Sequence, residues 1–187
     1  MRMPAARLLT CLRRFAADGR GISAVEFAMI LPLMVTLYLG SVEITQAVAV
    51  DRKTTLVAHT VADLVAQERS VSTSDMSDTL SAASTITSPY STTNLGVTVS
   101  QIKIDANGKA TIDWSVTQNG TARSHGDSVT LPSAALAVKN SYLIWGEATY
   151  TYKPMFGTII KSTLKLGDTI YMRPRVSSCV SYNGSTC

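Results

Sequence analysis

An apolar run near the N-terminus constrains this chain more than any other feature of its sequence. Residues 22–42 contain a single charged side chain, that of Glu26. At about 1.5 Å of rise per residue, a helix of this length matches a hydrocarbon core about 30 Å thick. The run therefore predicts a membrane-spanning helix. A carboxylate inside such a helix is costly, so Glu26 is a candidate functional residue that needs a cationic partner.

The distribution of charge predicts the orientation of this helix. All five basic residues of the N-terminal segment precede the run, and they are Arg2, Arg7, Arg13, Arg14 and Arg20. Such a bias keeps the N-terminus in the cytoplasm and sends the remainder across the membrane. After Gly21 the chain has 12 basic and 12 acidic residues. The net charge of +4 therefore belongs to the N-terminal segment, and nucleic acid is not an expected partner.

The boundary of the apolar run has the pattern of a processing and assembly signal. Gly21 lies at the membrane face, and Glu26 and Phe27 follow inside the run. Two simpler interpretations remain open. A secretory signal could be cut after residues 47–49, Ala-Val-Ala, to release a protein beginning at Val50. Alternatively, the run could be a plain, uncut anchor.

These residues resemble the class 3 leader peptides of type IV pilins, which are cut after a glycine. The chain is most similar to the TadE/TadG-like family of minor pseudopilins from Tad (Flp) pilus systems. The resemblance is strongest over residues 1–70, and lesser similarity extends to residues 104–108, Trp114 and residues 150–154. The segments that carry it are Arg13-Arg14-Phe15, Asp18, Gly21, residues 24–28 (AVEFA), Pro32 and residues 62–67 (ADLVAQ).

The resemblance implies cleavage between Gly21 and Ile22 by a prepilin peptidase. Glu26 would pair with the new amine of a neighbouring pilin, and Phe27 completes the recognition pattern. The implied role is in pilus assembly or initiation at the bacterial inner membrane, with the C-terminal domain in the periplasm. Implied partners are the peptidase, other pilins or pseudopilins and the assembly platform. The alternative is a membrane-anchored periplasmic binding or sensor module.

Beyond the membrane the helix is expected to continue, giving one helix over residues 22–69. Its second half carries an apolar stripe with helical spacing, formed by Val57, Val61, Leu64 and Val65. This stripe could pack on the chain's own domain or on another subunit. Pro32 lacks a backbone donor, so a kink or an unwound turn is expected there.

Residues 70–93 form a connection in which 14 of 24 residues are Ser or Thr. Ser74 is the expected cap of a short helix in this segment. Its apolar face would contain Met76, Leu80 and Ala83. Pro89 should end the secondary-structure element that precedes it.

Residues 94–187 predict a small β-rich domain, and the fold class is therefore α+β. Strands over 97–104 and 110–118 flank a turn that contains Asn107-Gly108. In the second strand, the period-2 pattern places Ala110, Ile112, Trp114 and Val116 on one core face. Further alternation indicates strands over 142–152 and 164–172, and Pro132 opens a short helix through Val138. We expect four antiparallel strands with a helix over one side.

The three cysteines fall in different compartments. Cys11 lies in the leader, whereas Cys179 and Cys187 lie in the exported tail, where disulfides are permitted. A bridge between them would contribute on the order of 2 kcal/mol. Two free thiols or an intermolecular bond remain the alternative.

The sequence gives little support for catalysis. His59 and His125 are the only histidines, and no nucleophile motif accompanies them. The chain contains no phosphate-binding loop, no dinucleotide fingerprint and no metal-ligand cluster. We therefore expect a protein that is not an enzyme and that has no cofactor and no metal.

Overall fold

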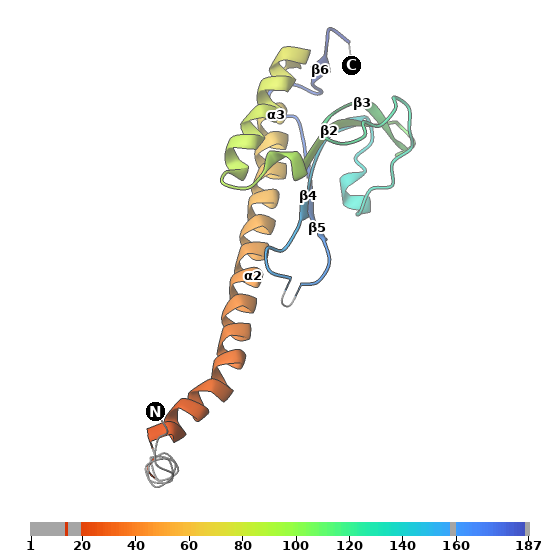
Figure 1. Ribbon diagram of the computed structural model, residues 1–187. Helices are drawn as coiled ribbons and strands as arrows, with labels where there is room; N and C mark the ends of the chain where they lie inside the picture. Colours follow the sequence, from red (N-terminus) through yellow and green to blue (C-terminus); the bar gives the residue numbers. More distant parts are fainter. Residues whose placement is uncertain (1–13, 15–19, 158–159, 186–187) are drawn as a thin grey trace.

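The computed structural model describes residue 14 and residues 20–157 and 160–185. Most of the expected leader, with Cys11, lies outside the described residues, as does Cys187. Figure 1 shows one long helix with a β-rich domain beside its C-terminal half, while the red and orange N-terminal half extends away from that domain. The expected α+β fold class, a long apolar helix followed by a small antiparallel sheet, is confirmed.

Helix α2 spans Arg20–Ala66 and has two different halves. Every described side chain from residue 21 to residue 38 is exposed, whereas one face is buried from Gly40 onward. The backbone stays α-helical through Pro32, so the expected unwound turn is absent, although Figure 1 shows the axis bending in its red-orange part. Near this point the hydroxyl of Thr36 donates to the carbonyl of Pro32 at 2.8 Å.

The buried face of α2 packs on the sheet and explains most of the apolar stripe. Val57, Val61 and Val65 are fully buried in the main core. Leu64 does not belong to this face, because its side chain is 40% exposed. It lies about 100° around the helix from Val65, off the line of residues four apart that the sheet covers.

Helix α3 spans Thr73–Thr87, and its N-cap is Ser72 and not the expected Ser74. The hydroxyl of Ser72 accepts from the backbone N–H of Asp75, and the carboxylate of Asp75 accepts from the backbone N–H of Ser72 at 2.9 Å. This reciprocal pair satisfies two donors at once, which a serine at position 74 cannot do here. The expected apolar face is correct: Met76, Leu80 and Ala83 are buried.

The sheet contains four antiparallel strands in the order β3-β2-β4-β5. Their bounds are Leu95–Ile104 for β2, Ala110–Gln118 for β3, Ser141–Tyr152 for β4 and Leu164–Met172 for β5. Helix α2 covers one face. The other face carries a second core at one end of the sheet, under the connection that includes Val129 and Leu131. In that connection the expected helix from Pro132 is only the 3-10 turn Ala134–Leu136.

A bulge in β3 overturns the expectation of a single core face. Gln101 pairs with Trp114, but Ile102 pairs with Ile112, so Asp113 has no opposite residue. The extra residue reverses the side on which the alternating side chains emerge. Trp114 therefore joins the core beneath α2, whereas Ile112 joins the second core on the opposite face.

Candidate functional site

The processing and assembly residues predicted from the sequence, Gly21, Ile22, Glu26 and Phe27, lie at the start of α2. Gly21 is the second residue of the helix, and a Cβ built on it would meet nothing within 4 Å. Ile22 and Phe27 are 63% and 64% exposed. The Gly21–Ile22 peptide bond is therefore not covered by any described part of the chain.

Glu26 lies one helical turn after Ile22, on the same side of α2. Its side chain is exposed, and it has no partner among the described residues. Of its neighbours one turn away on the helix, Ser23 has a hydroxyl and the others, Ile22, Met29 and Ile30, are apolar. A carboxylate in this setting can serve a partner from outside the chain, because nothing within the described chain satisfies it.

Glu43, a second carboxylate of α2, was not predicted as a site residue from the sequence. It directly follows the apolar run, is only 1% exposed and lies against the connection between β4 and β5. Its two carboxylate oxygens accept from the backbone N–H groups of Phe156, at 3.1 Å, and Ile160, at 3.4 Å. The hydroxyl of Tyr152 donates to its backbone carbonyl. The feature of the sequence that could have marked Glu43 as a site residue is its position as a lone acidic residue at the end of the apolar run.

These two glutamates are in opposite environments. They are 17 positions apart, which is about 26 Å along a helix. The structure therefore does not bring them together. Glu43 holds the domain to the helix, whereas Glu26 remains available to a partner from outside the chain.

Cys179 lies in what we call the C-terminal strap, residues 173–185. This segment runs beside the C-terminal end of α2, and its β6 strand, Ser181–Tyr182, pairs in parallel with β1, Ser70–Val71. Cys179 is buried and disulfide-bonded. Because Cys187 lies outside the described residues, its pairing with Cys179 stays a prediction.

A polar and aromatic cluster occupies the sheet face opposite α2. The guanidinium of Arg123 forms a bidentate pair with Glu147, with the second contact at 2.9 Å, and lies 3.6 Å from the ring centroid of Trp145. Trp145 stacks on Tyr171 at 5.5 Å. Burial, and then the charge of Glu147, raise the pKa of Tyr171, while Arg123 opposes this rise. The backbone N–H of Arg123 donates to Ser115, so the cluster attaches a surface connection to the sheet.

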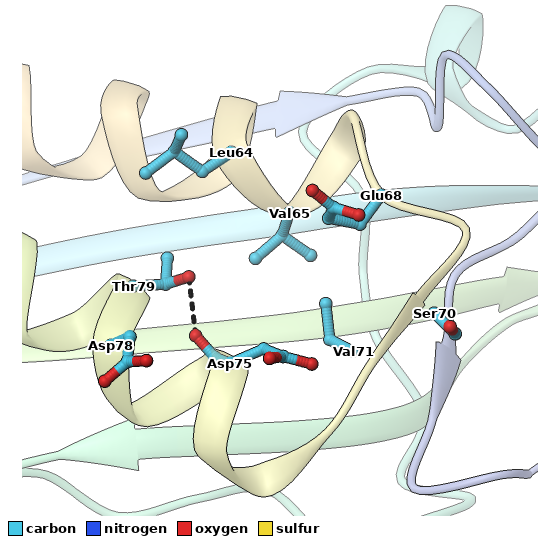
Figure 2. Close-up of a pocket in the computed structure, with 8 residues that line it drawn as sticks. All are labelled: Leu64, Val65, Glu68, Ser70, Val71, Asp75, Asp78 and Thr79. Carbon is cyan, nitrogen blue, oxygen red and sulfur yellow. Dashed lines mark hydrogen bonds between the residues drawn. The ribbon is translucent and has the colours of Figure 1, made fainter.

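A hollow at the C-terminal end of α2 carries three carboxylates. Figure 2 shows Glu68 after α2 and Asp75 and Asp78 on α3, with their side chains pointing to different sides. The carboxylate of Asp75 already accepts from the backbone N–H of Ser72 in the cap of α3, and the backbone N–H and then the hydroxyl of Ser72 lower its pKa. Among the described residues, no group of three or more His, Cys, Asp or Glu side chains could hold a metal ion.

The geometry thus points to α2 itself as the candidate site. Among the described residues it is the one helix long and apolar enough to cross a membrane. Residues 21–63 match the TadE-like protein family. The match confirms the resemblance to TadE-like proteins over this segment and suggests an association with a Tad pilus. Neither a curated protein nor a solved structure matches the chain.

The TadE-like segment begins at Gly21 and ends inside α2. It therefore contains Gly21, Ile22, Glu26, Phe27 and also Glu43. The sheet and the strap lie outside it. The TadE-like match therefore concerns α2, whose length and apolar composition suit a single-pass membrane anchor.

Proposed function

We propose that this chain is a minor pseudopilin of a Tad-type pilus. A prepilin peptidase removes residues 1–21 as a leader, and residues 22–69 form the membrane helix and its stalk. Residues 70–93 connect the stalk to a periplasmic domain, residues 94–187. The protein stays in the inner membrane and takes part in pilus assembly or initiation with other pilins. The observation that carries the proposal is the TadE-like match beginning at Gly21.

The surroundings of Gly21 support the idea that a partner protein, and not the fold of this chain, requires glycine at this position. A side chain here would meet no described atom within 4 Å, and the backbone does not have the positive φ that favours glycine. The fold itself therefore does not require glycine. A small subsite in a peptidase would require it.

Cleavage would give Glu26 a partner. The new amine of Ile22 would lie at the N-terminal end of α2, where the helix dipole is itself positive, so an ammonium there is poorly stabilised by its own helix. The exposed Glu26 of a neighbouring pilin can pair with this ammonium. Pairing offsets the desolvation costs of both charges.

Two substitutions separate cutting from assembly in a deletion strain complemented with the full chain. Gly21→Arg should block the cut and abolish pili. Glu26→Gln keeps the shape of the side chain, so cutting should continue. Assembly should fail, because removing one partner of a buried pair costs about 3–5 kcal/mol. Ser41→Ala, at an exposed position of the same helix, is the matched control and should support both steps.

The measurements are mass spectrometry of the mature N-terminus and a count of surface pili. An N-terminus at Val50 would establish the secretory alternative, and an intact chain in a peptidase-positive host would establish the plain anchor. Wild-type piliation by cleaved Glu26→Gln protein would show that Glu26 is not an assembly contact. Normal pili in the deletion strain itself would favour the periplasmic binding or sensor module.

A further inference from the structure

We propose that the connection between β4 and β5 is a second membrane contact, in which Met155 and Phe156 enter the interfacial region of the bilayer. Lys153 and Lys161 would bind the phosphates of the lipid headgroups. The proposal rests on the membrane anchor of the proposed function. It concerns the described residues 153–157 and 160–163, which we call the β4–β5 loop.

The contacts of Glu43 place this loop at the level where α2 leaves the membrane. Glu43 follows the apolar run directly, and its carboxylate accepts from the backbone of Phe156 and Ile160. Side chains on a helix point toward its N-terminus, so this carboxylate reaches back toward the apolar half. In Figure 1 the loop is the part of the domain that extends furthest along α2 toward the N-terminal half.

The side chains at the start of this loop are apolar and uncovered. Met155 is 72% exposed and Phe156 is 50% exposed, and they are adjacent in the chain. Outside α2, the other large apolar side chains that are exposed among the described residues are Val138 and Val176, each isolated and less exposed than Met155. Two adjacent apolar side chains at membrane level have a ready partner in the interfacial region of the bilayer.

Basic side chains flank the apolar pair. Lys153 and Lys161 are both exposed, and neither has an ion-pair partner among the described residues. A lysine near a membrane surface extends its ammonium toward lipid phosphates while its methylene chain covers apolar surface. The order cation, apolar pair, cation along the loop fits a lipid interface.

A groove beside the loop adds an aromatic side chain to this face. Met155 and Lys153 line it together with Tyr90, Tyr152 and Gln46. Tyr90 is only partly buried. Tyrosines are enriched at membrane interfaces because they have an apolar ring and a polar hydroxyl. The groove therefore extends the apolar and cationic surface of the loop with an aromatic side chain.

The test measures the depth of single residues in proteoliposomes that contain the full chain. Met155→Cys is made in a Cys11→Ser background and labelled with an environment-sensitive fluorophore without reduction. Ala106→Cys, in the turn at the opposite end of β2, is the matched control. Vesicles are phosphatidylcholine with or without phosphatidylglycerol, and some carry spin-labelled lipids as quenchers.

We expect a blue-shifted emission from position 155 that lipid quenchers remove, and neither effect at position 106. Quenching at position 155 should be stronger in vesicles with phosphatidylglycerol than in vesicles of phosphatidylcholine alone. A Lys153→Gln, Lys161→Gln variant should lose this difference. Equal, unquenched emission from the two positions in protein that remains anchored would overturn the inference. A blue shift that lipid quenchers leave intact and that grows with protein density would instead indicate a second copy of the chain, and would also overturn it. Extraction of the unlabelled chain from vesicles by alkaline carbonate would instead contradict the membrane anchor itself.

Discussion

At the scale of single residues, the two glutamates of α2 show how environment decides the role of a carboxylate. Glu26 is exposed on an apolar helix, whereas Glu43 is almost completely buried and accepts backbone N–H groups from the β4–β5 loop. Hydrogen bonds to a charged group contribute about 1.5–3 kcal/mol, roughly twice those between neutral groups. Glu43 therefore attaches the domain to the helix at the membrane edge.

Replacing Glu43 with Gln should loosen the β4–β5 loop without unfolding the domain. The amide keeps the size of the side chain but loses the charge and one acceptor oxygen, so both N–H contacts weaken. Trypsin should then cut faster after Lys161, which is exposed in this loop. Glu68→Gln, at an exposed position beyond α2, should leave the rate of this cut unchanged. Equal rates in wild type and Glu43→Gln would show that Glu43 does not hold the loop.

At the scale of elements, small residues set the distance between α2 and the sheet. Gly146 in β4 faces Ala58 and Ala62 of the helix. A Cβ on Gly146 would lie 2.7 Å from the Cβ of Ala62 and 2.8 Å from the carbonyl oxygen of Ala58. Neither atom belongs to a flexible side chain. The helix can therefore approach the strand closely only because position 146 has no side chain.

Gly146→Ala should destabilise the domain by about 1–3 kcal/mol, because the added methyl group forces the helix away from a packed core. The measurement is thermal unfolding of the full chain in detergent, followed by the circular dichroism of the tryptophans. Adding Ala62→Gly should restore part of the loss by removing one of the two close contacts. Thr151→Ala, in the same strand, is the control and should cost less. Wild-type stability of Gly146→Ala would mean that the helix moves freely over the sheet.

At the scale of the whole molecule, the C-terminal strap joins parts of the chain that are far apart in sequence. Its backbone donates to the end of α2, where the N–H of Arg175 reaches the carbonyl of Ala66 at 2.8 Å. The strap also contacts the sheet, because the indole of Trp114 in β3 donates to the carbonyl of Val180 at 2.9 Å. The side chain of Asn183 accepts from the backbone N–H of Thr73 at the start of α3. The strap thus connects both helices and the sheet.

The predicted bond between Cys179 and Cys187 would close the end of this strap, and peptide mapping can identify it. Trypsin should release residues 176–187 as one peptide that contains both cysteines, since no Lys or Arg follows Arg175. With the bond intact, this peptide should be lighter by two hydrogen atoms and should resist alkylation until it is reduced. Alkylation of both thiols without reduction, or a link to a different peptide, would contradict the pairing.

The sequence by itself determined the elements of this protein. The apolar run predicted the exposed half of α2, and period-2 alternation placed the strands within a few residues of β2, β3, β4 and β5. The TadE-like character of the helix could also be recognised from its residues. These features depend on residues that are close together in the chain, because local residue preferences and the spacing of apolar residues determine them. The processing site and the role of Glu26 remain predictions, because they involve partners outside the chain.

Only the tertiary structure decided which surfaces these elements share. The bulge at Asp113 divides one apolar stripe between two cores, because register is a property of the strand pair. The burial of Glu43 depends on a loop more than 110 residues away, as its bond to Phe156 shows. The pairing of β1 with β6 joins the connection after α2 to the C-terminal strap, two segments that are far apart in the sequence. Such contacts form only when distant segments meet, so a local pattern can mark a residue such as Glu43 but does not predict which segment it will contact.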